Sequence, residues 1–199
     1  ALIMHQPDLG TAMLIVFAGF IVMFLAGLSW WIVGGGAAIG AVGAFFAYNY
    51  VLHEYQRNRV DVFLGLADDP LGAGYHVLQS KIAIGSAGLF GRGYLQGTQS
   101  QLDFLPEKHT DFIFTMIVEE FGLVGGLLVL GLYGALMALA MQVALKARSL
   151  FGRLAAAGVA ATLASYVFIN TAMVIGLAPV VGIPLPMISF GGTAMMTLM

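Results

Sequence analysis

Long runs of apolar residues are the feature that most constrains how this chain can fold. A helix that crosses a bilayer needs about 20 consecutive, mostly apolar residues. Runs of this kind cover residues 9–28, 31–52, 112–145, 154–179 and 185–199, the last shorter than a full span. With 60% hydrophobic and only 9% charged residues, the chain lacks the charged surface of a soluble domain. The sequence therefore predicts an all-α polytopic membrane protein with about five transmembrane helices.

The rest of the composition excludes several kinds of function. The chain has no cysteine, so it has no disulfide framework, thiol nucleophile or thiolate metal site. Its formal net charge is −2 and it has no basic patch, which argues against a nucleic-acid partner. It opens on Ala1 without a signal-peptide pattern and stops at Met199 inside an apolar run. We therefore expect residues 1–199 to be a fragment of one membrane domain.

The connection between the third and fourth runs indicates the orientation in the membrane. Residues 146–153 include Lys146, Arg148 and Arg153 and no acidic residue. Short loops rich in Lys and Arg lie mostly in the cytoplasm, so this loop is predicted to be cytoplasmic. Counting spans outward from it places residues 53–111 in a large external loop.

The external loop is predicted to contain a short helix followed by irregular backbone. Residues 75–84 are amphipathic and too short to span, so we expect them to lie at the membrane interface or to re-enter the membrane. The glycines that follow, at 85, 88, 91, 93 and 97, match no nucleotide-binding motif. Irregular backbone is tolerated at membrane depth only where protein or a water-filled cavity covers it. Within the spans, Gly36-x-x-x-Gly40 and Gly122-x-x-x-Gly126 are predicted to be packing faces.

The densest polar cluster runs from Asp103 to Asp111, directly before the third span. It includes Glu107, Lys108 and His109. One interpretation is a helix cap with a solvated, charged shoulder, because acidic residues are common at helix starts. The other is a functional site holding a general base, a divalent cation or a proton relay. The same alternatives apply to His109, which is either a ligand or an interfacial side chain bonded to the backbone.

Two acidic residues inside the third run favour the functional interpretation. On a continuous helix Glu119 would lie roughly 12 Å beyond Asp111 and within about 80° of the same face, while Glu120 would point elsewhere. Acidic side chains at such depth are costly against lipid and normally face a cavity or a partner. Elsewhere, Asp8 is interpreted as a cap and Asn170 as an interhelical hydrogen-bonding residue. Residues 184–193 are interpreted as a structural, broken helix start, with the alternative that they line a cavity.

Several sequence strings together resemble one family, the shape, elongation, division and sporulation (SEDS) proteins. They are QPDLGTA (6–12), DPLGAGYH (69–76), GTQSQLDFLPE (97–107), HTDFIF (109–114) and PLPMISFGG (184–192). They occur in the family's order and cover the chain from end to end. GTQSQLDFLPE and INTAMVIGLAPVVG (169–182) are most similar to the elongation branch, RodA, whereas the division branch usually has a lysine near Val181.

The resemblance implies a ten-span glycosyltransferase of which this chain supplies the last five spans. Such an enzyme polymerises lipid II into glycan strands on the outer face of the bacterial cytoplasmic membrane, during elongation and rod-shape maintenance. The resemblance also implies that Asp111 and Asp103 are the catalytic acids. A class B penicillin-binding protein and other membrane proteins of the elongation complex are the implied partners.

A specific chemistry follows from that resemblance as a hypothesis. Asp111 would take a proton from a sugar hydroxyl, which attacks the second substrate with inversion and expels undecaprenyl diphosphate. Positive charge for the leaving group would come from a divalent cation (Mg²⁺ or Mn²⁺), or from Lys81, Arg92 or Lys108. The alternative role of each of these three side chains is a contact with a lipid headgroup. Glu107, His109 and Glu119 are further supporting candidates, and no metal ligand is assigned.

Two other functions fit some of the same features. A flippase for lipid-linked precursors also has several spans, a broken helix and intramembrane acidic residues. It would place those acids near mid-membrane, whereas here they cluster toward one boundary. A scaffold for a penicillin-binding protein would not need Asp111 at all.

Overall fold

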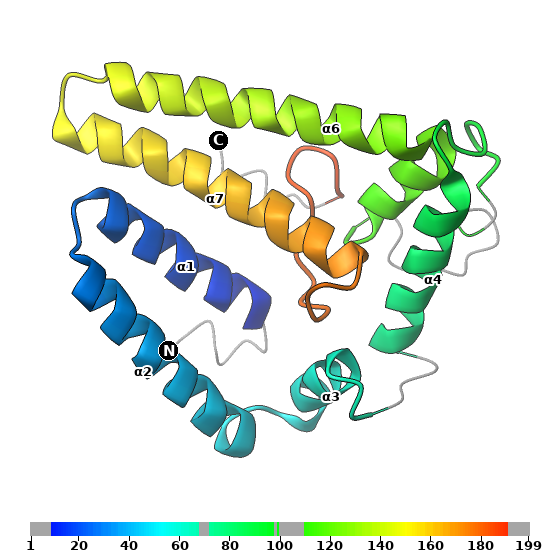
Figure 1. Cartoon of the computed structure of the whole chain (residues 1–199), viewed down its shortest axis with the longest axis horizontal. Coiled ribbons are helices and arrows are strands. Elements are labelled where there is room, and N and C mark those ends of the chain that lie inside the picture. The colour runs from blue at the N-terminus through cyan, green and yellow to red at the C-terminus, as the bar shows by residue number, and fades with distance from the viewer. Residues whose placement is uncertain (1–8, 68–71, 98, 100–109, 191–199) are drawn as a thin grey trace.

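The computed structural model describes residues 9–67, 72–97, 99 and 110–190. Six helices lie in this part of the chain (Figure 1): α1 Leu9–Leu25, α2 Trp30–Tyr50, α3 Glu54–Phe63, α4 Ala73–Ala87, α6 Ile113–Lys146 and α7 Leu150–Val174. No strand is found among the same residues. Three of the helices, α2, α6 and α7, are long and apolar enough to cross a membrane, and residues 14–25 form a shorter apolar stretch of α1. The predicted all-α, multi-pass membrane fold is confirmed.

The helices form two hairpins whose turns lie at one end of the molecule. In Figure 1 the α1–α2 and α6–α7 turns are on the left, while α3, α4 and the chain after α7 gather at the opposite end. The α6–α7 connection is shorter than the predicted loop 146–153, because Ser149 caps α7 by accepting a 3.0 Å hydrogen bond from the Gly152 N–H. A Ser side chain that satisfies an otherwise unpaired N–H starts the helix at that point.

The fourth and fifth predicted spans differ most from the structure. α7 ends at Val174, five residues before the predicted limit at 179, and Gly176 follows with φ 76°. Positive φ suits glycine and ends helices. Residues 175–190, here called the 175–190 segment, have no regular helix, so the span predicted from residue 185 does not begin there. The rest of that span, 191–199, lies outside the described residues.

α6 is broken at Gly122, which has non-helical backbone angles (φ 73°, ψ −168°). The chain folds back on itself at this glycine. A Cβ added to Gly126 would lie 2.8 Å from the Val118 side chain and 3.5 Å from that of Phe114. In a straight helix, residues eight apart are separated by about 12 Å. The first arm, 113–121, therefore packs beside α4, and the second arm, 123–146, runs along α7 (Figure 1).

The loop of residues 88–93, here called the bend loop, completes the backbone hydrogen bonding at this break. The N–H groups of Arg92 and Gly93 donate to the carbonyls of Glu119 and Glu120, both at 3.0 Å. The N–H groups of Leu123 and Val124 donate to carbonyls of the bend loop, both at 3.1 Å. A buried backbone group without a partner is costly, above all in a membrane. Four backbone groups of the bend loop and of α6 are thus paired with one another at the break, although the loop itself is largely exposed.

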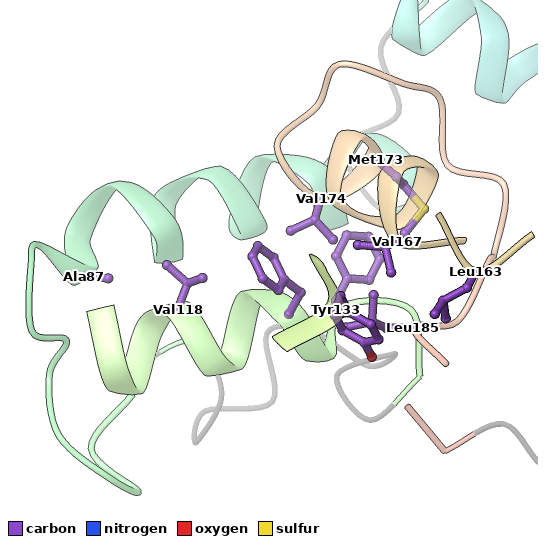
Figure 2. Packing of buried hydrophobic residues seen from close by; sticks show 10 residues of the cluster. Ala87, Val118, Tyr133, Leu163, Val167, Met173, Val174 and Leu185 are labelled. Atoms are coloured by element: carbon purple, nitrogen blue, oxygen red, sulfur yellow. The ribbon is translucent and has the colours of Figure 1, made fainter. Parts of the chain in front are cut away.

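The core joins α4, both arms of α6, α7 and the 175–190 segment. Figure 2 shows how side chains from all of these elements meet in one cluster: Ala87, Val118, Tyr133, Leu163, Val167, Met173, Val174 and Leu185. A buried polar contact lies within the same region. The Ser80 hydroxyl, fully buried, is 2.7 Å from the Thr115 hydroxyl and donates to the Val174 carbonyl at 2.8 Å. α1 adds a smaller cluster of Leu14, Tyr166 and Ile183.

Candidate active site

The described chain fixes the backbone of Asp111 through the side chain of Asn170. Asn170 is fully buried in α7, and its Nδ2 donates to the Asp111 carbonyl at 2.8 Å and to the Ile183 carbonyl at 2.7 Å. Because both partners are carbonyl oxygens, only the NH₂ end of the amide can face them. The Asn170 Oδ1 is buried without a hydrogen-bond partner. A single amide thus joins the start of α6, the body of α7 and the 175–190 segment.

Ser189 fixes the preceding residue in the same way. Its hydroxyl donates to the Thr110 carbonyl at 2.7 Å and accepts from the Leu185 N–H at 2.7 Å. The Tyr133 hydroxyl, from the second arm of α6, donates to the Pro186 carbonyl. We call Asn170 and Ser189 the Asp111 clamp, because together they bind the two carbonyls at and before Asp111. Groups held by several buried hydrogen bonds move little, which is what a catalytic side chain requires.

The carboxylate of Asp111 lies beside Gly182 in the described part of the chain. A Cβ added to Gly182, which has φ 71°, would be 3.5 Å from Asp111 Oδ2. Asp111 is half-buried and Gly182 is exposed. A larger residue at 182 would be strained and would contact the carboxylate. The Asp111 carbonyl is therefore bonded to Asn170, while its carboxylate lies against an exposed glycine.

Glu119 and Arg92 lie at the bend of α6 and not beside Asp111. The helix that starts at Ile113, two residues after Asp111, is continuous through Glu119 and breaks only beyond it, at Gly122. Glu119 is fully buried and accepts a 2.9 Å hydrogen bond from the Gln99 N–H. Arg92 belongs to the bend loop and is bonded through its backbone to the Glu119 carbonyl. Both residues stabilise the bend at the far end of the arm that starts at Asp111.

Lys81 lies closer to the segment that carries Gly182. It projects from α4 over Gly176, where an added Cβ would collide with the Lys81 side chain. Lys81 lines a cavity together with Arg59 of α3, whose Nη1 donates to the Val180 carbonyl at 3.0 Å. Val180 is two residues before Gly182, so this pair of cations borders the segment that contacts Asp111.

Four predicted site residues fall outside the described part of the chain. They are Asp103, Glu107, Lys108 and His109, and their roles stay predictions, as does the capping role of Asp8. Among the described residues, no group of three or more His, Asp or Glu side chains converges on one point.

Arg59, Ser189 and Gly182 were not among the residues predicted for the site. Arg59 stands in a polar stretch with several other charges, so no feature of the sequence singles it out. Ser189 lies in residues 184–193, which were interpreted as structural. Gly182 lies in residues 169–182, which were used only for the family resemblance. Asn170 was correctly expected to form hydrogen bonds between elements. That one of its acceptors is the Asp111 carbonyl is not visible in the sequence.

Comparison with known proteins agrees with the sequence resemblance. The family model FTSW_RODA_SPOVE, described as a cell cycle protein, matches residues 1–199. The chain is 51% identical over 200 residues to the peptidoglycan glycosyltransferase MrdB of Escherichia coli K12, covering all of this chain and 54% of the relative. It is 43% identical over 149 residues to the peptidoglycan glycosyltransferase RodA of Treponema pallidum, covering 75% of this chain and 34% of the relative. The chain thus spans about half the length of the E. coli relative.

Two solved structures share the fold. One, described as "Structural coordination of polymerization and crosslinking by a peptidoglycan synthase complex", has a TM-score of 0.77 and 36% identity, covering 99% of this chain and 54% of that one. The other, the D255A mutant of the Thermus thermophilus rod shape determining protein RodA, has a TM-score of 0.58 and 29% identity, covering 97% of this chain and 47% of that one. The full-length match to the family model is decisive: this chain belongs to the FtsW/RodA/SpoVE family of cell cycle proteins.

Proposed function

We propose that the protein containing this chain is a peptidoglycan glycosyltransferase that polymerises lipid II into glycan strands during cell elongation. It would work in the bacterial cytoplasmic membrane, with its site on the periplasmic face. The relatives named above as peptidoglycan glycosyltransferases support this activity. The Asp111 clamp is the structural observation that carries it, because it binds the carbonyls of Thr110 and Asp111 and so positions the half-buried Asp111.

In this proposal Asp111 is the general base. Its carboxylate takes the proton of the 4-hydroxyl on one lipid-linked disaccharide. That oxygen forms a bond to the anomeric carbon of the second substrate, with inversion, while the bond from this carbon to the diphosphate oxygen breaks. Undecaprenyl diphosphate leaves as an anion, and the proton stays on Asp111. A positioned base typically contributes about 10²–10⁴ in rate.

The leaving diphosphate needs positive charge, for which the described chain offers Lys81 and Arg59. Arg92 lies at the bend of α6, which makes it a weaker candidate for this role. A divalent cation remains part of the proposal, with at least some ligands from outside the described residues or from the substrates. Asp103, Glu107, Lys108 and His109 stay supporting candidates. A class B penicillin-binding protein and other elongation-complex membrane proteins are the proposed partners.

Glycan synthesis from purified lipid II tests the proposal. The full-length protein is assayed with its penicillin-binding partner, whose catalytic serine is blocked, and with no other polymerase present. Asp111→Asn keeps the size of the side chain. It also keeps the clamp bonds, which Asn170 and Ser189 make to the backbone carbonyls of Asp111 and Thr110. Because it removes the base, we expect polymer yield to fall by about 10²-fold or more. Glu54→Gln, at the exposed start of α3, is the matched control and should polymerise like the wild type.

The other outcomes identify the rival functions. Undiminished polymer from a folded Asp111→Asn variant would contradict the role of Asp111 and favour a scaffold. No polymer from the wild type, combined with transport of lipid II across a vesicle membrane, would favour a flippase.

A further inference from the structure

A groove lies between α1 and the first half of α7, toward the end of the molecule where both hairpins turn. It has a volume of about 360 Å³, and its lining residues include Val22 of α1 and Phe151, Ala155, Gly158 and Thr162 of α7. Gly158 lets the two helices approach closely, since a Cβ added to it would be 2.9 Å from the Val22 side chain. The Thr162 hydroxyl donates to the Gly158 carbonyl at 2.8 Å. With this hydroxyl bonded, the groove offers an apolar surface.

The length of the groove matches one half of a bilayer. Its lining residues on α7 run from Phe151 to Thr162, which corresponds to roughly 16 Å along a helix. The hydrocarbon core of a bilayer is about 30 Å thick, so one leaflet contributes about 15 Å. α7 is one of the helices that can cross a membrane. The groove therefore has the length that an acyl chain occupies within one leaflet.

The turn between α6 and α7, at the end of this groove, is positively charged. Residues 9–53 and 121–199 contain only three charged residues, and these are Lys146, Arg148 and Arg153. All three are exposed. The acidic residue nearest to them in the sequence is Glu120, at the bend of α6, and the second arm of α6 separates it from the turn by roughly 35 Å. The sequence thus places positive charge at the turn with no acidic residue near it.

Exposed tryptophans indicate that the same end of the molecule lies at a membrane boundary. Trp30 and Trp31, at the start of α2, are 75% and 91% exposed. The α1–α2 turn that precedes them lies beside the α6–α7 turn in Figure 1. Tryptophan is enriched where a bilayer meets water. In the orientation predicted from the sequence this boundary is the cytoplasmic one, where anionic lipids give the leaflet a negative surface potential.

We propose that the groove between α1 and α7 binds one acyl chain of an anionic phospholipid, whose phosphate is bound by Arg148 and Arg153. Arg148 precedes Phe151 by three residues, and Arg153 directly precedes Leu154, another lining residue. Arginine binds phosphate through charge-assisted hydrogen bonds, and its long stem lets the charged end reach the headgroup level. A transmembrane helix could also fill an apolar groove. The basic turn favours the lipid, because a lipid supplies an anion together with the hydrocarbon.

Photo-crosslinking of the full-length protein, purified with its partner in detergent micelles, tests this proposal. The probe is a phosphatidylglycerol with a photoactivatable group in one acyl chain. The matched probe is the phosphatidylcholine with the same chains, whose headgroup has no net charge. Labelling is mapped by mass spectrometry to peptides that contain Val22 or residues 151–162. We expect phosphatidylglycerol to label these peptides about fivefold more than phosphatidylcholine, or better, because one Lys or Arg beside an anionic lipid contributes about that factor.

Two variants separate the headgroup from the acyl chain. Arg148→Gln combined with Arg153→Gln removes two exposed charges, and should lower labelling by phosphatidylglycerol by roughly tenfold or more. Ala155→Phe keeps the charges but fills the groove from an exposed position, so neither lipid should label these peptides. Lys81→Gln in α4 and Ala138→Phe on an exposed part of α6 are the matched controls, and both should label like the wild type.

Any of three results would overturn the proposal. Equal labelling by the two lipids would mean that the groove binds hydrocarbon without recognising the headgroup. Unchanged labelling of the double arginine variant or of Ala155→Phe would place the lipid elsewhere. Absence of lipid labelling would also contradict the proposal, and a crosslink from a photoactivatable residue at position 155 to another peptide would then identify a membrane helix as the occupant.

The test is independent of the proposed function and of the predicted orientation. Labelling needs no turnover, and micelles have no sidedness. Asp111→Asn should therefore label like the wild type even though it makes no polymer.

Discussion

Two regions of this molecule have similar apolar composition but opposite packing. In the region formed by α4, α6, α7 and the 175–190 segment, fully buried residues include polar ones such as Ser80, Glu119 and Asn170. In α2 no residue is buried, and Trp31 is 91% exposed. Both regions are membrane-compatible, so hydrophobicity does not distinguish them. What differs is that the first region satisfies its irregular backbone internally, whereas α2 satisfies its own backbone as a regular helix.

That difference explains where the candidate site lies. A carboxylate can be held in place only where buried polar groups bind the backbone around it, and those groups need a packed environment. α2 presents glycine, alanine and aromatic residues outward with few neighbours, so it can contact lipid or another membrane-spanning helix. The predictions below test whether the two regions really differ in this way.

The largest effect is expected from Gly122→Ala. The new Cβ would need positive φ and would collide with the backbone of Leu89 and Gly91, so the bend loop would have to detach. We expect the free energy of unfolding, measured by denaturant titration of the full-length protein in micelles, to fall by roughly 3 kcal/mol or more. Gly131→Ala is the control: no other atom lies within 4 Å of its Cβ position, so stability should be unchanged or higher by up to about 1 kcal/mol.

Asn170→Ala should have the next largest effect. It leaves the carbonyls of Asp111 and Ile183 without a partner in a buried site, so we expect a loss of roughly 2–4 kcal/mol in unfolding free energy. Polymer synthesis should fall as well, because Asp111 is no longer held. Ser165→Ala in the same helix removes a hydroxyl bonded only to the Ala161 carbonyl one turn earlier, and should change stability by less than about 1 kcal/mol. Equal effects of the two variants would contradict the clamp.

Ser189→Ala separates the role of the clamp in positioning from its role in stability. It removes the bonds to Thr110 and Leu185, so we expect a loss of about 1–2 kcal/mol and a lower rate at saturating lipid II. Ser149→Ala removes a helix cap at the opposite end and should cost about 0.5–1 kcal/mol without changing that rate. If both variants polymerised at the wild-type rate, the positioning role of Ser189 would be wrong.

The smallest effect is expected from Gly40→Ala in α2. No other atom lies within 4 Å of its Cβ position, and the helix is regular there. The free energy of unfolding of the full-length protein should therefore stay the same or rise by up to about 1 kcal/mol, as for Gly131→Ala. A loss above about 1 kcal/mol would instead show that another span packs closely on this face, as the Gly36-x-x-x-Gly40 pattern would allow.

The sequence alone predicted the fold class well, because membrane spans are set by length and polarity. Its runs 31–52 and 112–145 correspond within two residues to α2 and α6. The family resemblance also implied Asp111 as the base, and Lys81 was one of three candidate cations, with Arg92 and Lys108; these roles stay predictions. The sequence did not predict the bend of α6. Gly122 was interpreted as part of a packing face, and hydropathy cannot show that its φ is positive or that residues 88–93 supply the missing hydrogen bonds.

What the sequence by itself determined is which segments belong in a membrane, which family the chain resembles, and which acidic residue deserves a test. These follow from composition and local pattern, which do not depend on distant parts of the chain. The tertiary structure alone decided that Asn170 binds the backbone of Asp111, that Arg59 and Lys81 share a cavity, and that Glu119 stabilises a bend. Each of these depends on contacts between residues at least 20 positions apart. Such contacts form only in the folded core, where buried backbone polar groups need hydrogen-bond partners.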